Sequence, residues 1–131
     1  MTHETIKNDQ QAVLVVEDDE LVLKTTARMI ERMGFNVHTA MNAKEAQRIL
    51  DQHENVCMAV IDLLLPDTDG ITLGATIRTN QPDTRLLFIS GYPDEILEER
   101  GIVAAEMPIL NKPYTLNELV KMVKETLNLP D

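Results

Sequence analysis

Five short apolar runs alternate with amphipathic segments along this chain, and this alternation restricts the possible folds more than any other feature of the sequence. The segments between the runs carry apolar residues three and four positions apart, which is typical of helices. Strands separated by helices are joined by crossovers, so the strands must be parallel and each crossover right-handed. The sequence therefore predicts an α/β fold, a doubly wound five-stranded parallel sheet in the order 2-1-3-4-5 between two helical layers. The strands are expected at 12–16, 35–40, 57–61, 85–89 and 107–110.

The chain has the length of one domain and is strongly acidic. Its 131 residues include 12 Lys and Arg against 22 Asp and Glu, which gives a net charge of −10. A field of that sign repels nucleic acids and anionic membranes, so we expect no direct partner of either kind. We expect one domain at 12–128, between a flexible N-terminal tail at 1–11 and a short C-terminal tail at 129–131.

The cellular compartment follows from cysteine use and hydropathy. The single cysteine, Cys57, cannot form an internal disulfide, which suits a reducing setting. No apolar window approaches the roughly 20 residues needed to span a bilayer, and the first residues form no apolar leader. The sequence favours a cytoplasmic location.

Polar side chains close four of the five predicted strands. Glu17 and Asp18 follow the first strand, and Asp62 follows the third. Ser90 follows the fourth strand, and Lys112 follows the fifth. Because the carboxyl ends of parallel strands meet at one edge of the sheet, we expect these side chains to converge there.

Three carboxylates at one edge repel one another, by about 4 kcal/mol for a pair 4 Å apart at an effective dielectric near 20. A hard divalent cation, most plausibly Mg²⁺, relieves this repulsion. Lys112 and Ser90 have a role if an anion also binds there, since the ammonium offsets its charge and the hydroxyl donates to it. A carboxylate such as Asp62 can ligate a metal, or it can act as a nucleophile that forms an aspartyl phosphate.

Four motifs taken in order carry a family resemblance. VLVVEDDE, the Asp62 strand with its LPDTDG continuation, LLFISGY and LNKPY span about Ala12 to Leu127. Together they resemble a two-component response-regulator receiver domain, stand-alone or from a hybrid histidine kinase, with the flavodoxin-like, CheY-like three-layer sandwich that this family adopts. The resemblance implies that Asp62 is the phosphoacceptor. It also implies that Asp18 and Asp62 bind Mg²⁺ directly, that Glu17 acts through water, and that the backbone carbonyl of Leu64 completes the protein ligands.

The same resemblance assigns roles around the phosphoryl group. Ser90 and Lys112 would contact its oxygens, and Gly91 would leave room for them. Leu64 and Tyr92 flank the site and would affect the access of water. The domain would thus assist its own phosphorylation and dephosphorylation, mostly by positioning and electrostatics.

The implied partners are a histidine kinase or histidine phosphotransfer protein, which supplies a phosphohistidine, and a downstream protein target. Phosphorylated Asp62 would draw in the Ser90 hydroxyl and change the contact face near the fifth strand. The chain departs from the family at Ile109, where an aromatic residue is usual. We expect Ile109 to stay buried. Either it couples to Ser90 by packing alone, or the conformational output is weak.

Three other classes of function could use some of these residues. A phosphatase of the haloacid-dehalogenase type needs a second acid two residues after Asp62, where Leu64 stands. A metal-dependent nucleic-acid enzyme could use Glu17 with Asp67 and Asp69, but it leaves Lys112 unexplained; we read both aspartates as turn formers. The third alternative is a receiver-like docking module that is never phosphorylated.

Overall fold

A five-stranded sheet forms the centre of the computed structural model, which describes residues 11–102 and 107–130. The strands are β1 (Ala12–Val16), β2 (Asn36–Ala40), β3 (Val56–Asp62), β4 (Arg85–Ser90) and β5 (Ile109–Asn111). Their order in the sheet is β2-β1-β3-β4-β5, and every neighbouring pair is parallel. The predicted fold class and strand order are therefore confirmed. The second strand begins one residue later than expected, and the fifth begins two residues later and runs to Asn111.

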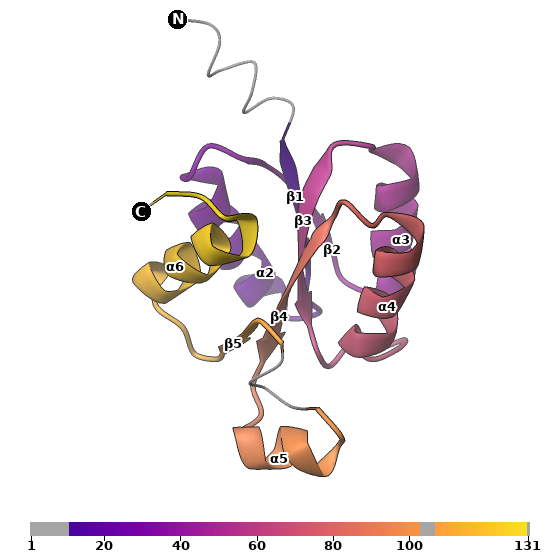
Figure 1. Ribbon diagram of the computed structural model, residues 1–131, viewed down its shortest axis with the longest axis vertical. Helices are drawn as coiled ribbons and strands as arrows, with labels where there is room; N and C mark the ends of the chain where they lie inside the picture. The colour runs from indigo at the N-terminus through magenta and orange to yellow at the C-terminus, as the bar shows by residue number, and fades with distance from the viewer. Residues whose placement is uncertain (1–10, 103–106, 131) are drawn as a thin grey trace, which may run out of the picture.

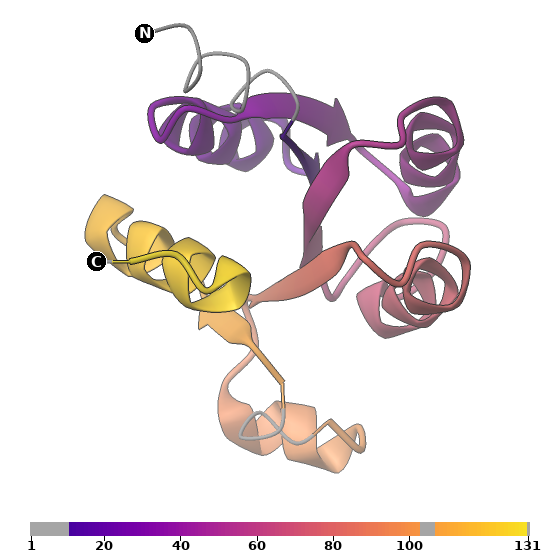
Figure 2. The same ribbon diagram turned by 45° about the horizontal axis from the view of Figure 1, so that its top comes forward.

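Helices connect the strands and cover both faces of the sheet. They are α2 (Glu20–Glu31), α3 (Ala43–Gln52), α4 (Gly70–Asn80), α5 (Asp94–Glu99) and α6 (Leu116–Leu127). Figures 1 and 2 show α2 and α6 on one side of the sheet and α3 and α4 on the other. In the described part of the chain, no helix is long and apolar enough to cross a membrane.

The core has two halves because successive side chains of a strand point to opposite faces. All five residues of β1 are buried. Leu14 and Val16 pack with the α3 and α4 side, whereas Val13 and Val15 pack with the α2 and α6 side. Each fully buried aliphatic side chain contributes about 1.5 to 3 kcal/mol to folding. Burial on both faces explains why the strand is apolar throughout instead of alternating.

Side-chain caps begin four of the helices near the carboxyl edge. The Asp19 carboxylate accepts the N–H groups of Leu21 and Val22, at 3.0 and 3.2 Å. Thr115 and Glu118 form a reciprocal capping box at the start of α6. The side chain of Asn42 caps α3 by accepting the N–H of Glu45, and that of Asp69 caps α4 by accepting the N–H of Thr72. These bonds fix the turns that follow β1, β2, β3 and β5.

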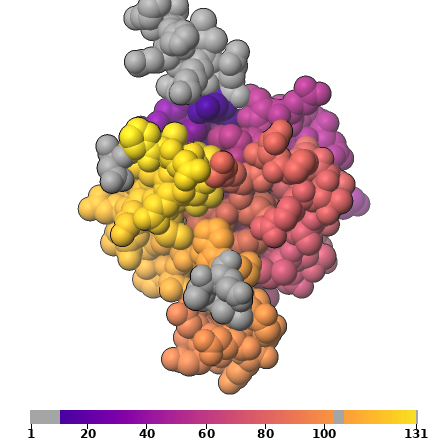
Figure 3. All heavy atoms as spheres, in the orientation of Figure 1, coloured from indigo at the N-terminus to yellow at the C-terminus, as the bar shows by residue number. Residues whose placement is uncertain are grey.

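Helix α5 does not lie beside the other helices. It extends beyond the carboxyl end of β4 in Figure 1 and forms a separate lobe in the space-filling view (Figure 3). Its six residues include one buried side chain, Leu97, and no side chain caps its N-terminus. So short a helix cannot bury the continuous stripe that holds α2 or α6 on the sheet. The sequence predicts a helix whose first turn holds Pro93, Asp94 and Glu95 and whose weak pattern continues over 96–105. The start agrees with α5, whereas 103–105 lie outside the described residues, as does most of the expected tail at 1–11.

Candidate functional site

A hollow of about 440 Å³ at the carboxyl ends of the strands collects nearly all of the predicted site residues. It is lined by Glu17, Asp18, Asp19, Asp62, Leu63, Leu64, Ser90, Gly91, Tyr92 and Lys112. Of the residues that sequence reasoning selected, only Ile109 is not among them. The convergence follows from topology, since β1, β3, β4 and β5 all end at this edge.

Asp62 is the last residue of β3 and is 4% exposed. Its Oδ2 accepts a hydrogen bond of 2.5 Å from the Lys112 ammonium, and its Oδ1 accepts the N–H of Leu64 at 2.8 Å. The chain turns tightly behind it, because the N–H of Gly70 donates to the carbonyl of Leu63 at 2.9 Å. A Cβ at Gly70 would lie 2.4 Å from the backbone oxygen of Asp62, so only glycine fits there.

Lys112 binds two carboxylates at once. Its Nζ lies 2.5 Å from Asp62 Oδ2 and also 2.5 Å from Oε1 of the buried Glu17. Burial alone would lower the pKa of this ammonium, but its interactions with the two carboxylates outweigh burial and raise the pKa. The backbone N–H of Lys112 donates to the carbonyl of Ser90 at 2.8 Å, which holds the residue against the end of β4.

Glu17 is the most perturbed acid of the site. Burial raises the pKa of its carboxyl from 4.5 to about 7, Lys112 opposes this rise, and the nearby Asp62 adds to it. Its Oε2 accepts the N–H of Asp19 at 3.2 Å. Its Oε1 has no partner of good hydrogen-bond geometry among the described residues, although the Lys112 ammonium lies close enough for an ion pair.

The three acids can hold a metal ion. Glu17, Asp18 and Asp62 each present a carboxylate oxygen, and these oxygens lie within 4.8 Å of one another. Asp18 is exposed, so a metal held here would keep an open side toward solvent. The incompletely satisfied Glu17 Oε1 and the all-oxygen donor set both fit a hard divalent cation.

Ser90, Gly91 and Tyr92 form the wall opposite the acids. The buried Ser90 hydroxyl accepts the N–H of Tyr92 at 3.0 Å. A Cβ at Gly91 would meet nothing closer than Lys112 Cδ, at 3.9 Å. Ser90 is therefore bonded to its own turn in this state, and Gly91 leaves open space beside the lysine.

Ile109 begins β5 and pairs with Phe88 of β4. It is half-buried and packs on the α3 and α4 side of the core, so the expectation of full burial is too strong. β5 is an edge strand, and an edge residue is covered from one side only.

Two interactions around the site escaped sequence reasoning. Asp67 was expected to form a turn, but its carboxylate accepts the N–H groups of Ala43 and Lys44, at 2.9 and 3.0 Å, and so caps the neighbouring helix α3. These bonds lower the pKa of Asp67. The hydroxyls of Tyr114 and Thr26 hydrogen-bond with each other across 88 residues of sequence. Neither pair has a local sequence signal, because the partners meet only in the folded chain.

An apolar hollow of about 480 Å³ adjoins the acidic one. It lies between α2 and the segment after β5, and we call it the α2 hollow. It is lined by Leu21, Val22, Thr25, Thr26, Met29, Gly91, Lys112, Pro113 and Tyr114. Leu21 is 75% exposed, so the α2 hollow presents a large apolar side chain to solvent. Gly91 and Lys112 line both hollows and so lie between them.

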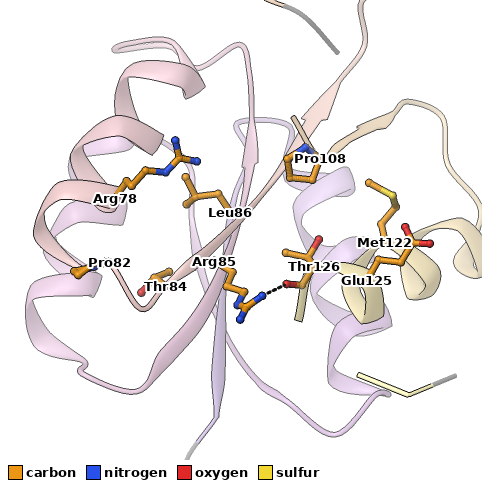
Figure 4. A pocket seen from close by; sticks show the side chains of 9 residues that line it. All are labelled: Arg78, Pro82, Thr84, Arg85, Leu86, Pro108, Met122, Glu125 and Thr126. Carbon is orange, nitrogen blue, oxygen red and sulfur yellow. Dashed lines mark hydrogen bonds between the residues drawn. The ribbon is translucent and has the colours of Figure 1, made fainter. Parts of the chain in front are cut away.

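A third hollow, of about 580 Å³, lies at the other end of β4 between α4 and α6 (Figure 4). There the Arg85 guanidinium donates to the carbonyl of Thr126 at 3.1 Å. Arg78 and Glu125 also line it, and Glu125 is its only acidic residue among the described ones. It is larger than the acidic hollow but holds none of the predicted site residues, so we do not assign the chemistry to it.

Comparisons with known proteins agree with this geometry. Residues 13–124 match the family model described as response regulator receiver domain. The chain is 33% identical over 120 residues to the sensor kinase CckA of Brucella abortus, which covers 91% of this chain but 13% of that protein. It is thus similar to one part of a much longer relative.

Solved structures give the same result. A CheY-like receiver domain protein from Methanospirillum hungatei aligns with a TM-score of 0.78 and 25% identity, covering 90% of this chain and 94% of that one. The receiver domain of the hybrid histidine kinase CckA aligns with a TM-score of 0.71 and 28% identity, covering 88% and 98%. The chain therefore belongs to the response-regulator receiver family, whose members serve two-component signalling.

Proposed function

We propose that Asp62 accepts a phosphoryl group in the cytoplasm from a phosphohistidine, carried by a histidine kinase or a histidine phosphotransfer protein. Receiver domains of two-component systems interact with proteins of these kinds. One observation carries the proposal: Asp62 is a buried carboxylate that contacts a lysine ammonium and lies within 4.8 Å of two further acids. This combination suits transfer of a phosphoryl group onto a carboxylate.

In the proposed reaction a carboxylate oxygen of Asp62 attacks phosphorus in line with the histidine nitrogen. The new O–P bond forms as the N–P bond breaks, and the histidine leaves with its electron pair. Lys112 already lies 2.5 Å from Asp62, so its ammonium can move onto the phosphoryl oxygens and offset their charge. Ser90 would exchange the N–H of Tyr92 for a phosphoryl oxygen, to which its hydroxyl donates.

We further propose that the site holds Mg²⁺ through Asp18, Asp62 and the backbone carbonyl of Leu64, with Glu17 acting through water. When bound, Mg²⁺ would neutralise charge that develops on the phosphoryl oxygens. Because the pKa of Glu17 is raised to about 7 in the metal-free chain, a cation there has to displace a proton from this carboxyl below that pH.

The fate of the aspartyl phosphate would depend on residues at the mouth of the acidic hollow. Leu64 is 55% exposed and Tyr92 is half-buried, so both can limit the approach of hydrolytic water. Movement of the Ser90 hydroxyl would reach Ile109 by packing through Phe88, since β4 and β5 are paired there. A downstream protein target would then read the changed surface around β5.

The partner that carries the phosphohistidine is proposed to dock on the α2 hollow. This surface is apolar, it exposes Leu21, and it shares Gly91 and Lys112 with the acidic hollow. A protein seated on it can therefore reach Asp62 without a large movement of the domain.

Intact mass after incubation with acetyl phosphate and Mg²⁺ tests the phosphoacceptor role. The wild-type chain should gain one phosphoryl group, and neither Asp62→Asn nor a wild-type sample treated with chelator should gain it. Asp67→Asn is the matched control, because Asp67 is an exposed aspartate outside the acidic hollow, and it should be phosphorylated. If the wild type gains no mass and Mg²⁺ does not raise its melting temperature, the chain is instead a docking module that is never phosphorylated.

A further inference from the structure

The hydroxyls of Tyr114 and Thr26 form a hydrogen bond that joins two separate parts of the site's framework. Tyr114 lies between β5 and α6, two residues after Lys112, and is half-buried. Thr26 belongs to α2 and is 1% exposed. Leaving a buried hydroxyl without a hydrogen-bond partner costs about 1 to 3 kcal/mol of folding free energy. The bond is therefore favoured in the folded chain.

The position of this bond relates it to Lys112. Helix α2 starts directly after the acids Glu17 and Asp18, so Thr26 is rigidly connected to them. On the other side, the backbone N–H of Lys112 donates to the carbonyl of Ser90. The Lys112 segment is thus held to β4 by its own backbone and to α2 by the Tyr114 side chain.

Tyr114 is also within electrostatic range of the site. Burial raises the pKa of its phenol, the hydrogen bond with the Thr26 hydroxyl opposes the rise, and Glu17, Lys112 and Asp62 each make a smaller contribution. The phenol therefore stays neutral at ordinary pH and keeps its hydrogen. Neither Tyr114 nor Thr26 makes a hydrogen bond to Asp62 or to another acid of the hollow among the described contacts.

We infer that Tyr114 and Thr26 act together as a positioning pair, which holds Lys112 over Asp62 in the geometry that phosphoryl transfer requires. This inference rests on the proposed phosphorylation of Asp62. A lysine reaches its target through a flexible four-carbon stem, so the position of its backbone decides how often the ammonium is in place. A small displacement of a group that stabilises charge lowers the reaction rate, even when the substitution that causes it is at another residue.

Three variants test the pair: Tyr114→Phe, Thr26→Val and the double variant. Each removes a hydroxyl and nearly keeps the shape of the side chain. The experiment measures the phosphorylation rate with acetyl phosphate and Mg²⁺, so no protein partner contributes to the result. We expect each single variant to lower the rate at saturating acetyl phosphate roughly fivefold, with little change in KM, which is the size of one hydrogen bond. The double variant should be no slower than either single one, because both lose the same bond.

Thr76→Val is the matched control, since Thr76 is an exposed threonine of α4 whose hydroxyl donates to the carbonyl of Thr72. Its rate should equal that of the wild type. A second readout does not depend on phosphorylation: the ¹⁵N resonance of the Lys112 ammonium in the metal-free protein should shift in the three variants and not in Thr76→Val.

Unchanged rates in the single variants, or losses that add in the double variant, would overturn the inference. So would a Lys112 resonance that stays in place while only the melting temperature falls, because the pair would then be structural. If the wild type itself gains no phosphoryl group, the proposed function fails, and the Lys112 resonance alone decides whether the pair positions the lysine.

Discussion

The two halves of the sheet are built differently where they reach the same edge. On the β1 and β3 side, the strands are five and seven residues long and almost every residue is buried. On the other side, β5 has three residues, of which one is buried, and α5 has six residues and no side-chain cap. The acids of the site lie on the first side, whereas Ser90 leads into α5 and Lys112 follows β5.

The difference suits a domain that combines chemistry with signalling. Carboxylates that share a cation must be held in place, and the buried β1 and β3 provide this. A segment with few buried contacts opens or shifts at low free-energy cost, and the region of α5 has that character. We call β1 and β3 the firm half and β5 and α5 the looser half. The proposed phosphorylation would therefore take place on the firm half and change the surface of the looser half.

Among the predictions, loss of Lys112 is expected to have the largest effect on the chemistry proposed for Asp62 of the firm half. Lys112→Ala should slow phosphorylation by acetyl phosphate about a hundredfold, because the only ammonium in contact with Asp62 among the described residues is removed. Rates from intact-mass time courses would measure this. Lys121→Ala, at an exposed lysine of α6, is the control and should not alter the rate. A loss below threefold would mean that the Lys112 ammonium does not stabilise the transferred group.

Truncation of matched leucines compares the two halves directly. Leu14 of β1 and Leu97 of α5 are both fully buried. Leu14→Ala should reduce the free energy of unfolding by about 4 kcal/mol, within the range known for buried leucines. Leu97→Ala should cost about 2 kcal/mol or less, because α5 can open without unfolding the sheet. Denaturant titrations measure both, and equal losses would show that α5 is held as firmly as β1.

Substitution of two glycines by alanine compares the backbone of the two halves. Gly70→Ala should destabilise the fold by about 3 kcal/mol, because its Cβ would meet the backbone of Asp62 at 2.4 Å. Gly101 has a φ of +80° and no atom within 4 Å of an added Cβ. Gly101→Ala should cost only about 1 kcal/mol, the strain of a left-handed alanine. Thermal or chemical unfolding would contradict the comparison if the order of the two losses were reversed.

Glu17 should give a smaller, pH-dependent effect. Its pKa is raised from 4.5 to about 7 in the fold, so the folded chain keeps a proton that the unfolded chain releases. Stability should therefore fall as pH rises through this window, with the full cost present above pH 7. In metal-free wild-type protein, the melting temperature should be a few degrees lower at pH 8 than at pH 5 because of Glu17. Glu17→Gln should lack this part of the fall.

His38 titrates in the same window with the opposite sign. Burial lowers its pKa, and the stacked His53 ring lowers it further, so this side chain favours stability at higher pH. The comparison with Glu17→Gln cancels the histidine contribution, since both proteins contain it. A variant whose pH profile matched that of the wild type would show that Glu17 titrates normally.

Sequence reasoning identified the sheet order and the site edge because both depend on simple rules. Alternating strands and helices imply parallel pairing, and the carboxyl ends of parallel strands then lie together, which brings Asp62 to Lys112. Capping residues such as Thr115 and Asn42 were also readable, because the cap and its partner lie three residues apart.

Contacts between distant residues were beyond that reasoning. Asp67 caps a helix 24 residues earlier, and Tyr114 meets Thr26 across 88 residues. Both depend on how close two loops or helices approach, which periodicity does not encode. The position of α5 was missed for a different reason: its sequence has too few apolar residues to indicate which surface it would cover.

The residues shared by the α2 hollow and the acidic hollow would set an order of events if a donor docks as proposed. Gly91 and Lys112 belong to both, so a protein bound on the first also narrows the mouth of the second. While the proposed donor is docked, water and any competing acceptor would have less access to Asp62. Transfer of the phosphoryl group and its hydrolysis would both need this opening, so they could not occur at the same time. Hydrolysis of the aspartyl phosphate would begin only when the donor dissociates.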